Sequence, residues 1–319
     1  AILLNYTEVA LIAIGLTYVI AAGDIDLSVG AVLALAGSTA AYALKVLGLD
    51  PFSAMALGLA VGTLAGVVNA ALTVWLGLPA FIATLGMFYM ARGAAAWIVS
   101  GQQLTGWNET YNLIGRKVGD ILSYLGLPHP SGFIGAVTEV VSVQTLWMIF
   151  VAILAGTVLG FMIFGQKLYA TGGNRRAADY AGINTNQVRF IALVFCAVCA
   201  TMAGLINIAY FRSFNPVAGQ FRELDGIAAV IIGGGSIFGG YGTVIGALAG
   251  AAVITLIRAL LQLNVRGFSM PQHWVNVFVG TILIIAVLID IWVRQANIFG
   301  VLRERMRKHR RLRLESIDA

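Results

Sequence analysis

Residues 226–257 read GIAAVIIGGGSIFGGYGTVIGALAGAAVITLI, a run of 32 residues without a charged side chain. A membrane-spanning helix needs roughly 20 apolar residues, so this run is too long for one comfortable span. Ala54–Leu78, Thr145–Gln166 and Ile191–Phe211 are also uncharged, and each is long enough to cross once. These runs predict an all-α protein that crosses a membrane many times.

The overall composition supports the same conclusion. Hydrophobic residues make up 59% of the 319 residues and charged residues only 11%, whereas soluble domains carry about 25% charged residues. The 38 glycines are typical of membrane helices, where small residues let backbones approach each other. A soluble globular domain is therefore excluded.

The sequence predicts nine membrane spans, one long loop and a basic tail. A long loop at 101–144 separates the first four spans from the rest, and residues 302–319 form a basic tail after a single membrane domain at 1–301. The chain opens at Ala1 without a signal-peptide pattern. The spans lie at about 2–22, 29–47, 53–76, 79–100, 146–165, 190–211, 226–240, 243–263 and 274–293.

The distribution of lysine and arginine predicts the orientation, because these residues favour cytoplasmic loops. The segment 166–189 and the tail are basic, so both are expected in the cytoplasm, whereas loop 101–144 has balanced charge and is expected outside. The tail is expected to lie near anionic lipid, and a nucleic-acid contact is the weaker alternative. The basic residues of the segment are Lys167, Arg175, Arg176 and Arg189.

This orientation requires an even number of crossings between span 190–211 and the last span. Residues 226–263 are therefore expected to form two short spans or a re-entrant pair that turns near Gly239–Gly242. A weak internal repeat supports this turn, because GDIDLSVGAV (23–32) matches GSIFGGYGTV (235–244) at four of ten positions. The same count predicts one more span before Ala1, which would make ten.

Several polar residues in or beside the spans are candidates for a solute pathway or for gating. Asp24 and Asp26 would bind a proton or sodium ion, or else cap the helix that begins near Leu27, and we favour capping. Arg92 would line a pathway, or else extend to the membrane surface or bond to carbonyl groups at a break beside Gly93. The remaining candidates would line a pathway or bond neighbouring helices to each other: Asn69, Thr84, Asn207 and Asn276.

No motif points to catalysis in this chain. A GxxxxGKS or GxxxxGKT loop is absent, so the chain does not hydrolyse ATP by that route. Cys196 and Cys199 lie in an uncharged span without a nearby histidine, which favours plain packing over a metal or redox site. We therefore expect no catalytic residues, no metal site and no cofactor in this chain.

The polar segment ATGGNRRAADYAGINTNQVRF (170–190) lies between two apolar runs. Its composition predicts a short cytoplasmic helix over Asn174–Gly182 that ends at a glycine, and a solvated loop is the alternative. Such a helix could seat in a groove of a partner. The residues concerned are Gly172, Gly173, Asn174, Arg175, Arg176, Ala177, Ala178, Tyr180, Ala181 and Gly182.

Four motifs in the same order resemble the membrane permeases of ribose-type sugar ABC importers, the second carbohydrate-uptake class. The similarity extends from about Tyr6 to Asp290. Arg175-Arg176 and the long basic tail depart from the usual pattern, so the docking surface would be specific to its partner. The motifs are GDIDLSVG (23–30), PAFIATLGM (79–87), YATGGNRRAADYAGIN (169–184) and ELDGIAAVIIGGGSIFGGYGTVIGALAG (223–250).

The resemblance implies a multi-pass protein of the bacterial inner membrane with ten spans and a cytoplasmic C-terminus. Gly173–Gly182 would couple to a separate ATP-binding subunit that holds ATP and Mg²⁺. A periplasmic sugar-binding protein would dock on loops 101–144, 212–225 and 264–272, and a second permease copy or paralogue would complete a dimer. The alternatives are an ABC permease for a branched amino acid or nucleoside, and an ion-coupled secondary transporter that uses Asp24 and Asp26.

Overall fold

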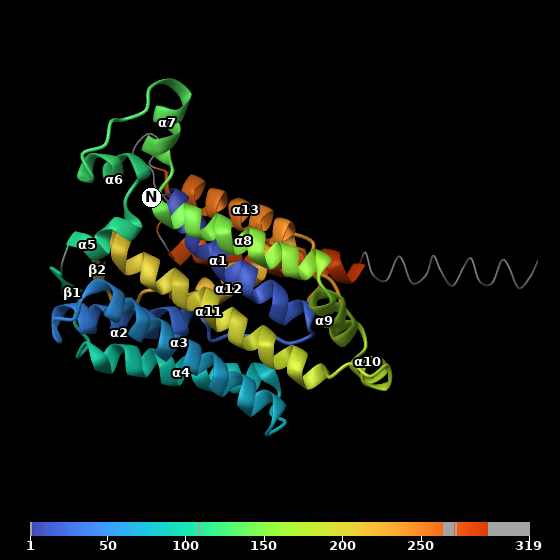
Figure 1. Cartoon of the computed structure of the whole chain (residues 1–319). Coiled ribbons are helices and arrows are strands. Elements are labelled where there is room, and N and C mark those ends of the chain that lie inside the picture. Colours follow the sequence, from blue (N-terminus) through green and yellow to red (C-terminus); the bar gives the residue numbers. More distant parts are fainter. Residues whose placement is uncertain (1, 108, 264–270, 272, 293–319) are drawn as a thin grey trace, which may run out of the picture.

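The computed structural model describes every residue except 1, 108, 264–270, 272 and 293–319. It is a bundle of long helices with one two-stranded ribbon (Figure 1). In this described part, seven helices are long and apolar enough to cross a membrane. They are α1 (Ile2–Ala21), α3 (Pro51–Val74), α4 (Ala80–Ile98), α8 (Val143–Phe161), α11 (Thr185–Phe211), α13 (Val244–Gln262) and His273–Trp292.

The other two predicted spans are shorter in the structure. α2 (Val29–Lys45) has 17 residues, and α12 (Arg222–Ile232) has 11. The prediction of a span over 226–240 is wrong, because α12 ends at Ile232 and a turn with positive φ at Gly234, Gly239 and Gly240 follows. At 1.5 Å per residue α12 is about 16 Å long, too short to cross alone.

α12 and α13 form a pair joined by a glycine turn, as expected for residues 226–263. Arg258 near the end of α13 donates from Nη2 to Asp225 Oδ1 near the start of α12, at 2.6 Å. The pair therefore begins and ends at the same end of the bundle, and its glycine turn reaches the other end.

α1 and α11 form the centre of the bundle. From Val9 to Ala21 every residue of α1 is buried, and Figure 1 shows the helix enclosed by α8, α11, α12 and α13. The two central helices cross closely, because a Cβ on Gly15 would lie 2.9 Å from the Cα of Cys196. Cys196 and Cys199 are both buried free thiols at this crossing. The prediction that they serve packing is confirmed.

The outer helices turn large apolar side chains outward. Trp97 of α4, Phe150 of α8 and Phe161 at the end of α8 are all exposed. An exposed apolar belt over several helices is unusual for a soluble protein but is what lipid contact requires.

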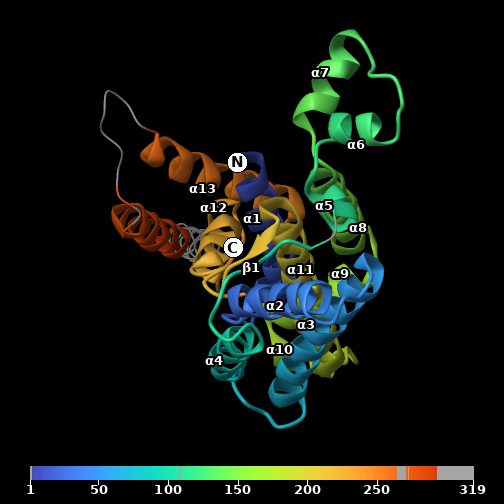
Figure 2. The same ribbon diagram turned by 90° about the vertical axis from the view of Figure 1, so that its left-hand side faces the viewer.

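The two ends of the bundle differ (Figure 2). Loop 101–144 folds at one end as β1 (Leu104–Thr105), α5 (Glu109–Asn112), a 3-10 turn Leu113–Gly115, α6 (Val118–Tyr124) and α7 (Gly132–Val140). β1 pairs antiparallel with β2 (Ser213–Phe214), which joins this loop to the segment after α11. The opposite end carries α9 (Ile163–Gly173) and α10 (Arg175–Tyr180).

Two predicted features lie largely outside the described residues. They are the basic tail 302–319 and most of the predicted docking loop 264–272.

Candidate functional site

The polar segment 170–190 forms the short helix that was predicted. Asn174 caps α10, because its side-chain oxygen accepts a hydrogen bond from the Ala177 amide at 3.1 Å. Gly182 follows the helix with φ +81°, as a glycine at this position commonly does. Ala178 is buried, whereas Tyr180 is 92% exposed. α10 therefore protrudes from the end of the bundle and offers an open face.

Asp24 connects this segment to the core. Arg189 of α11 donates two hydrogen bonds to the Asp24 carboxylate, from Nε at 2.6 Å and from Nη2 at 2.9 Å. Arg175 of α10 approaches the same carboxylate at 3.5 Å. The prediction that Asp24 caps α2 is wrong, because both of its oxygens face arginines from other helices.

Three glycine-rich segments meet beside Asp24. We call this contact the glycine junction, and its members are Gly23, Gly172, Gly239 and Gly240. The Gly240 amide donates to the Ala21 carbonyl at 2.9 Å. A Cβ on Gly172 would lie 1.9 Å from that carbonyl oxygen and 2.6 Å from the Gly240 nitrogen. The two turns of the internal repeat, at Gly23 and at Gly239–Gly240, are therefore in direct backbone contact. The end of α9 packs against both.

Asp26 belongs to a buried cluster that holds the break between α1 and α2. Its Oδ1 accepts from the amide and the hydroxyl of Ser28, at 2.8 and 2.6 Å. Asn69 donates to the Ser28 hydroxyl at 2.9 Å, and the Thr84 hydroxyl accepts from the Leu27 amide at 3.1 Å. Ser28 is the N-cap position of α2 but makes no side-chain cap bond. Asp26 thus satisfies the Ser28 amide directly before α2, which agrees with the expected capping role, although the N-cap position itself is Ser28.

Arg92 bonds to carbonyl groups, but not at the expected place. α4 runs without a break past Gly93. The Nη1 atom of Arg92 donates to the carbonyls of Ala218 at 2.5 Å and Pro216 at 3.5 Å, on the loop that follows β2. Arg92 therefore anchors this loop to the bundle.

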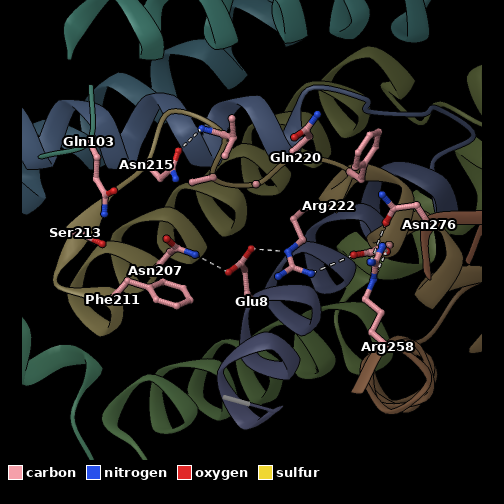
Figure 3. Close-up of a pocket in the computed structure, with 15 residues that line it drawn as sticks. Glu8, Gln103, Asn207, Phe211, Ser213, Asn215, Gln220, Arg222, Arg258 and Asn276 are labelled. Carbon is pink, nitrogen blue, oxygen red and sulfur yellow. Dashed lines mark hydrogen bonds and ion pairs between the residues drawn. The ribbon is translucent and has the colours of Figure 1, made fainter. Parts of the chain in front are cut away.

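A second polar site lies at the end opposite α10 (Figure 3). Four charged residues, which we call the outer ion network, bond in series: Glu8, Arg222, Asp225 and Arg258. Arg222 donates from Nε to Glu8 at 2.7 Å and from Nη1 to Asp225 at 3.1 Å. Arg258 donates from Nη2 to Asp225 at 2.6 Å. α1, α12 and α13 are joined in this way.

Two of the predicted pathway residues form hydrogen bonds with members of this network. Asn207 of α11 donates to Glu8 at 2.8 Å, and Arg258 donates to Asn276 at 3.2 Å. Together with the loop after β2 these residues line a cavity of about 440 Å³, which we call the outer pocket. Its wall also contains Gln103, Phe211, Ser213, Asn215, Val217, Ala218, Gly219, Gln220 and Phe221.

The charged members of the outer pocket were not among the site residues predicted from the sequence. Glu8 lies within an apolar helix, and a buried carboxylate in a membrane span is costly enough to mark a functional or paired residue. That signal was present for Glu8. Arg222 and Asp225 read as loop residues because α12 was expected to begin at Gly226. Within the described residues, no group of His, Cys, Asp and Glu side chains gathers as metal ligands.

The chain has close relatives among known transport proteins. A family described as the permease component of the branched-chain amino acid transport system matches residues 1–287. The ribose import permease protein RbsC of Escherichia coli is 35% identical over 90% of this chain and 84% of its own length. The fructose import permease protein FrcC of Rhizobium meliloti is 32% identical, over 92% and 78%.

A third relative is the D-allose transport system permease protein AlsC of Escherichia coli, 32% identical over 88% of this chain and 79% of its own length. No solved structure matches the chain. The family match covers most of the chain, and its apolar helices fit a multi-pass protein of the inner membrane. The chain is therefore a transporter subunit and belongs to the family of permeases of ribose-type sugar ABC importers.

Proposed function

We propose that this chain carries a monosaccharide or polyol into the bacterial cytoplasm, driven by ATP hydrolysis on a separate subunit. The named substrates of its relatives, ribose, fructose and D-allose, support this substrate class. ATP and Mg²⁺ would bind to the separate subunit, because the chain has no P-loop sequence.

The observation that carries the proposal is the connection between α10 and the two glycine turns. The exposed face of α10 docks on the ATP-binding subunit. Arg175 connects that helix to Asp24, and Gly172 at the end of α9 packs on Ala21 and Gly240. Because the contacts of Gly172 are made to backbone atoms without intervening side chains, a push on α10 and α9 moves the ends of α1 and of the α12–α13 turn together. This is a rigid-body route for switching access.

The same arrangement supports the proposed orientation. The end with α10 and its basic residues faces the cytoplasm, by the preference of lysine and arginine for that side. The basic sequence of the tail favours the same side for the C-terminus. The opposite end, with loop 101–144 and the segment after α11, receives a periplasmic sugar-binding protein. A second permease copy or paralogue packs against the apolar surface in the membrane.

The proposal is tested by co-purification of the full-length permease with the ATP-binding subunit encoded beside it. Tyr180→Asp places a charge on the exposed face of α10, where the side chain has no folding role because it is 92% exposed. We expect this variant to lose the ATP-binding subunit. Tyr124→Asp is the matched control, because Tyr124 is an exposed tyrosine on α6 at the other end of the bundle.

Association that survives Tyr180→Asp, or is lost equally in Tyr124→Asp, would contradict docking on α10. Uptake into proteoliposomes then tests the energy source. Import that requires ATP and the ATP-binding subunit, and that persists when proton and sodium gradients are collapsed, supports the proposal. Import driven by a gradient alone would show an ion-coupled transporter, and leucine as substrate would show an amino acid permease.

A further inference from the structure

The outer pocket has the size and the lining of a small-molecule site. Its volume is about 440 Å³, and pockets for small ligands occupy about 300–1,000 Å³. Eight segments contribute to it: α1, the loop before β1, α11, β2, the loop after β2, α12, α13 and the helix His273–Trp292. We propose that the outer pocket binds a neutral polyhydroxyl solute, a monosaccharide or polyol, before it moves further inward. This inference rests on the proposed function and assigns a site to it.

The charge balance of the outer pocket selects a neutral solute. Glu8 and Asp225 contribute two carboxylates, and Arg222 and Arg258 contribute two guanidinium groups, so the net charge of the network is zero. Each of the four charges is already engaged with a partner of opposite sign. A phosphate, a carboxylate or an amine would have to break one of these pairs, whereas hydroxyl groups can bond at the edges of the network and leave it intact.

The hydrogen-bonding groups of the pocket match a ring of hydroxyls. Each hydroxyl both donates and accepts, and the pocket offers acceptors on Glu8, donors on Arg222 and amides that do both on Gln103 and Asn207. Figure 3 shows these side chains around one space. The bonds among the four charged side chains hold these groups in place, and Glu8 and Asp225 are each only 1% exposed. A solute therefore meets preorganised partners and does not have to order them.

The pocket also has an apolar wall. The ring of Phe211, at the end of α11, is half exposed and belongs to the pocket lining. Val217 and Ala218 on the loop after β2 extend this wall. The C–H face of a sugar ring packs on such a surface, whereas a purely hydrated ion gains nothing from it. The combination of apolar wall and neutral polar network thus favours a sugar over an ion.

The test is saturation-transfer NMR on the full-length permease in nanodiscs, without partner subunits. D-ribose, D-fructose and D-allose are the probes. Asn207→Leu removes one amide from the pocket and fills part of its volume. Asn186→Leu is the matched control, because Asn186 is an exposed asparagine on the same helix α11 at the α10 end. We expect at least one sugar to give a signal with the wild type and with Asn186→Leu. We expect Asn207→Leu to weaken its binding about tenfold, or about 1.4 kcal/mol.

A second variant covers the case in which Asn207→Leu does not fold. Phe211→Ala removes the exposed ring and leaves the network untouched, and Phe133→Ala, an exposed phenylalanine on α7, is its control. We expect the signal to fall in Phe211→Ala and to persist in Phe133→Ala. The proposal is overturned if no probe binds the wild type, or if binding is the same in the pocket variants and their controls.

Failure of this inference is distinguishable from failure of the proposed function. ATP-dependent uptake of one of the three sugars by the assembled transporter, without binding to the isolated permease, would overturn the outer pocket alone. The outer ion network would then only hold α1, α12 and α13 together. Absence of ATP-dependent uptake for every sugar would count against the proposed function itself.

Discussion

The glycine junction and the outer pocket lie at opposite ends of the same helix, and they are built from opposite materials. Ala21 at one end of α1 touches Gly172 and Gly240 through backbone atoms alone. Glu8 near the other end is joined to α11 and α12 through charged and amide side chains. The junction has no room for a side chain, whereas the pocket leaves a cavity of about 440 Å³.

One helix can serve two tasks because its two ends are packed differently. Backbone packing transmits displacement, because close-packed interiors are not continuously deformable. A side-chain network beside a cavity can accept a solute, because hydroxyl groups can bond at the edges of the network and leave it intact. α1 thus connects an end suited to receive motion with an end suited to hold a solute.

The largest expected effect comes from the outer ion network. Glu8→Ala leaves Arg222 buried with Asp225 but without its second partner. Breaking a buried ion pair by removing one member costs about 3–5 kcal/mol. We expect a corresponding loss of thermal stability in detergent, measured as the fraction that stays monodisperse after heating. Glu8→Gln keeps an acceptor for Arg222 and is expected to lose less. Equal losses for both variants would show that the negative charge of Glu8, which both variants remove, determines the effect, and not the hydrogen-bond acceptor.

The next effect tests the junction. Gly172→Ala places a Cβ 1.9 Å from the Ala21 carbonyl oxygen, and forcing an extra methyl group into a packed contact costs about 1–3 kcal/mol. Gly173→Ala is the control, because a Cβ there would lie 4.0 Å from its nearest neighbour, the Cα of Gly240. We expect reduced stability and uptake only in Gly172→Ala. A harmless Gly172→Ala would mean that α9 does not press on the two turns.

Much of the fold was readable from local sequence, because apolar length and glycine position act over short distances. The seven long spans, the glycine turn between α12 and α13, and α10 follow from such features. The ion networks were not readable, because Asp24 pairs with Arg189 over a separation of 165 residues and Glu8 with Arg222 over 214. Asn207 and Asn276 were identified as pathway candidates, but their partners were not, since only tertiary packing places Glu8 of α1 beside Asn207 and Arg258 of α13 beside Asn276.

The cap of α10 gives a smaller, local effect. Asn174→Ala removes the side-chain acceptor of the Ala177 amide, which costs about 1 kcal/mol of helix stability. We expect faster hydrogen exchange of the α10 amides, with no change in the centre of α11. Asn186→Ala, an exposed asparagine without a cap bond to α10, is the control. Unchanged exchange would mean that α10 is held by its contacts with the bundle and not by its own cap.

The smallest effect on stability is expected for Arg175→Ala. Arg175 is 41% exposed and reaches Asp24 at 3.5 Å, whereas Arg189 holds the same carboxylate with two shorter bonds. A solvent-exposed ion pair contributes about 0–1 kcal/mol, so thermal stability should barely change. If the Arg175 contact transmits motion from α10 to α1, ATP-dependent uptake falls while the ATP-binding subunit stays bound. If uptake is unchanged, transmission runs through Gly172 alone, and the backbone contact is sufficient to connect the two ends of α1.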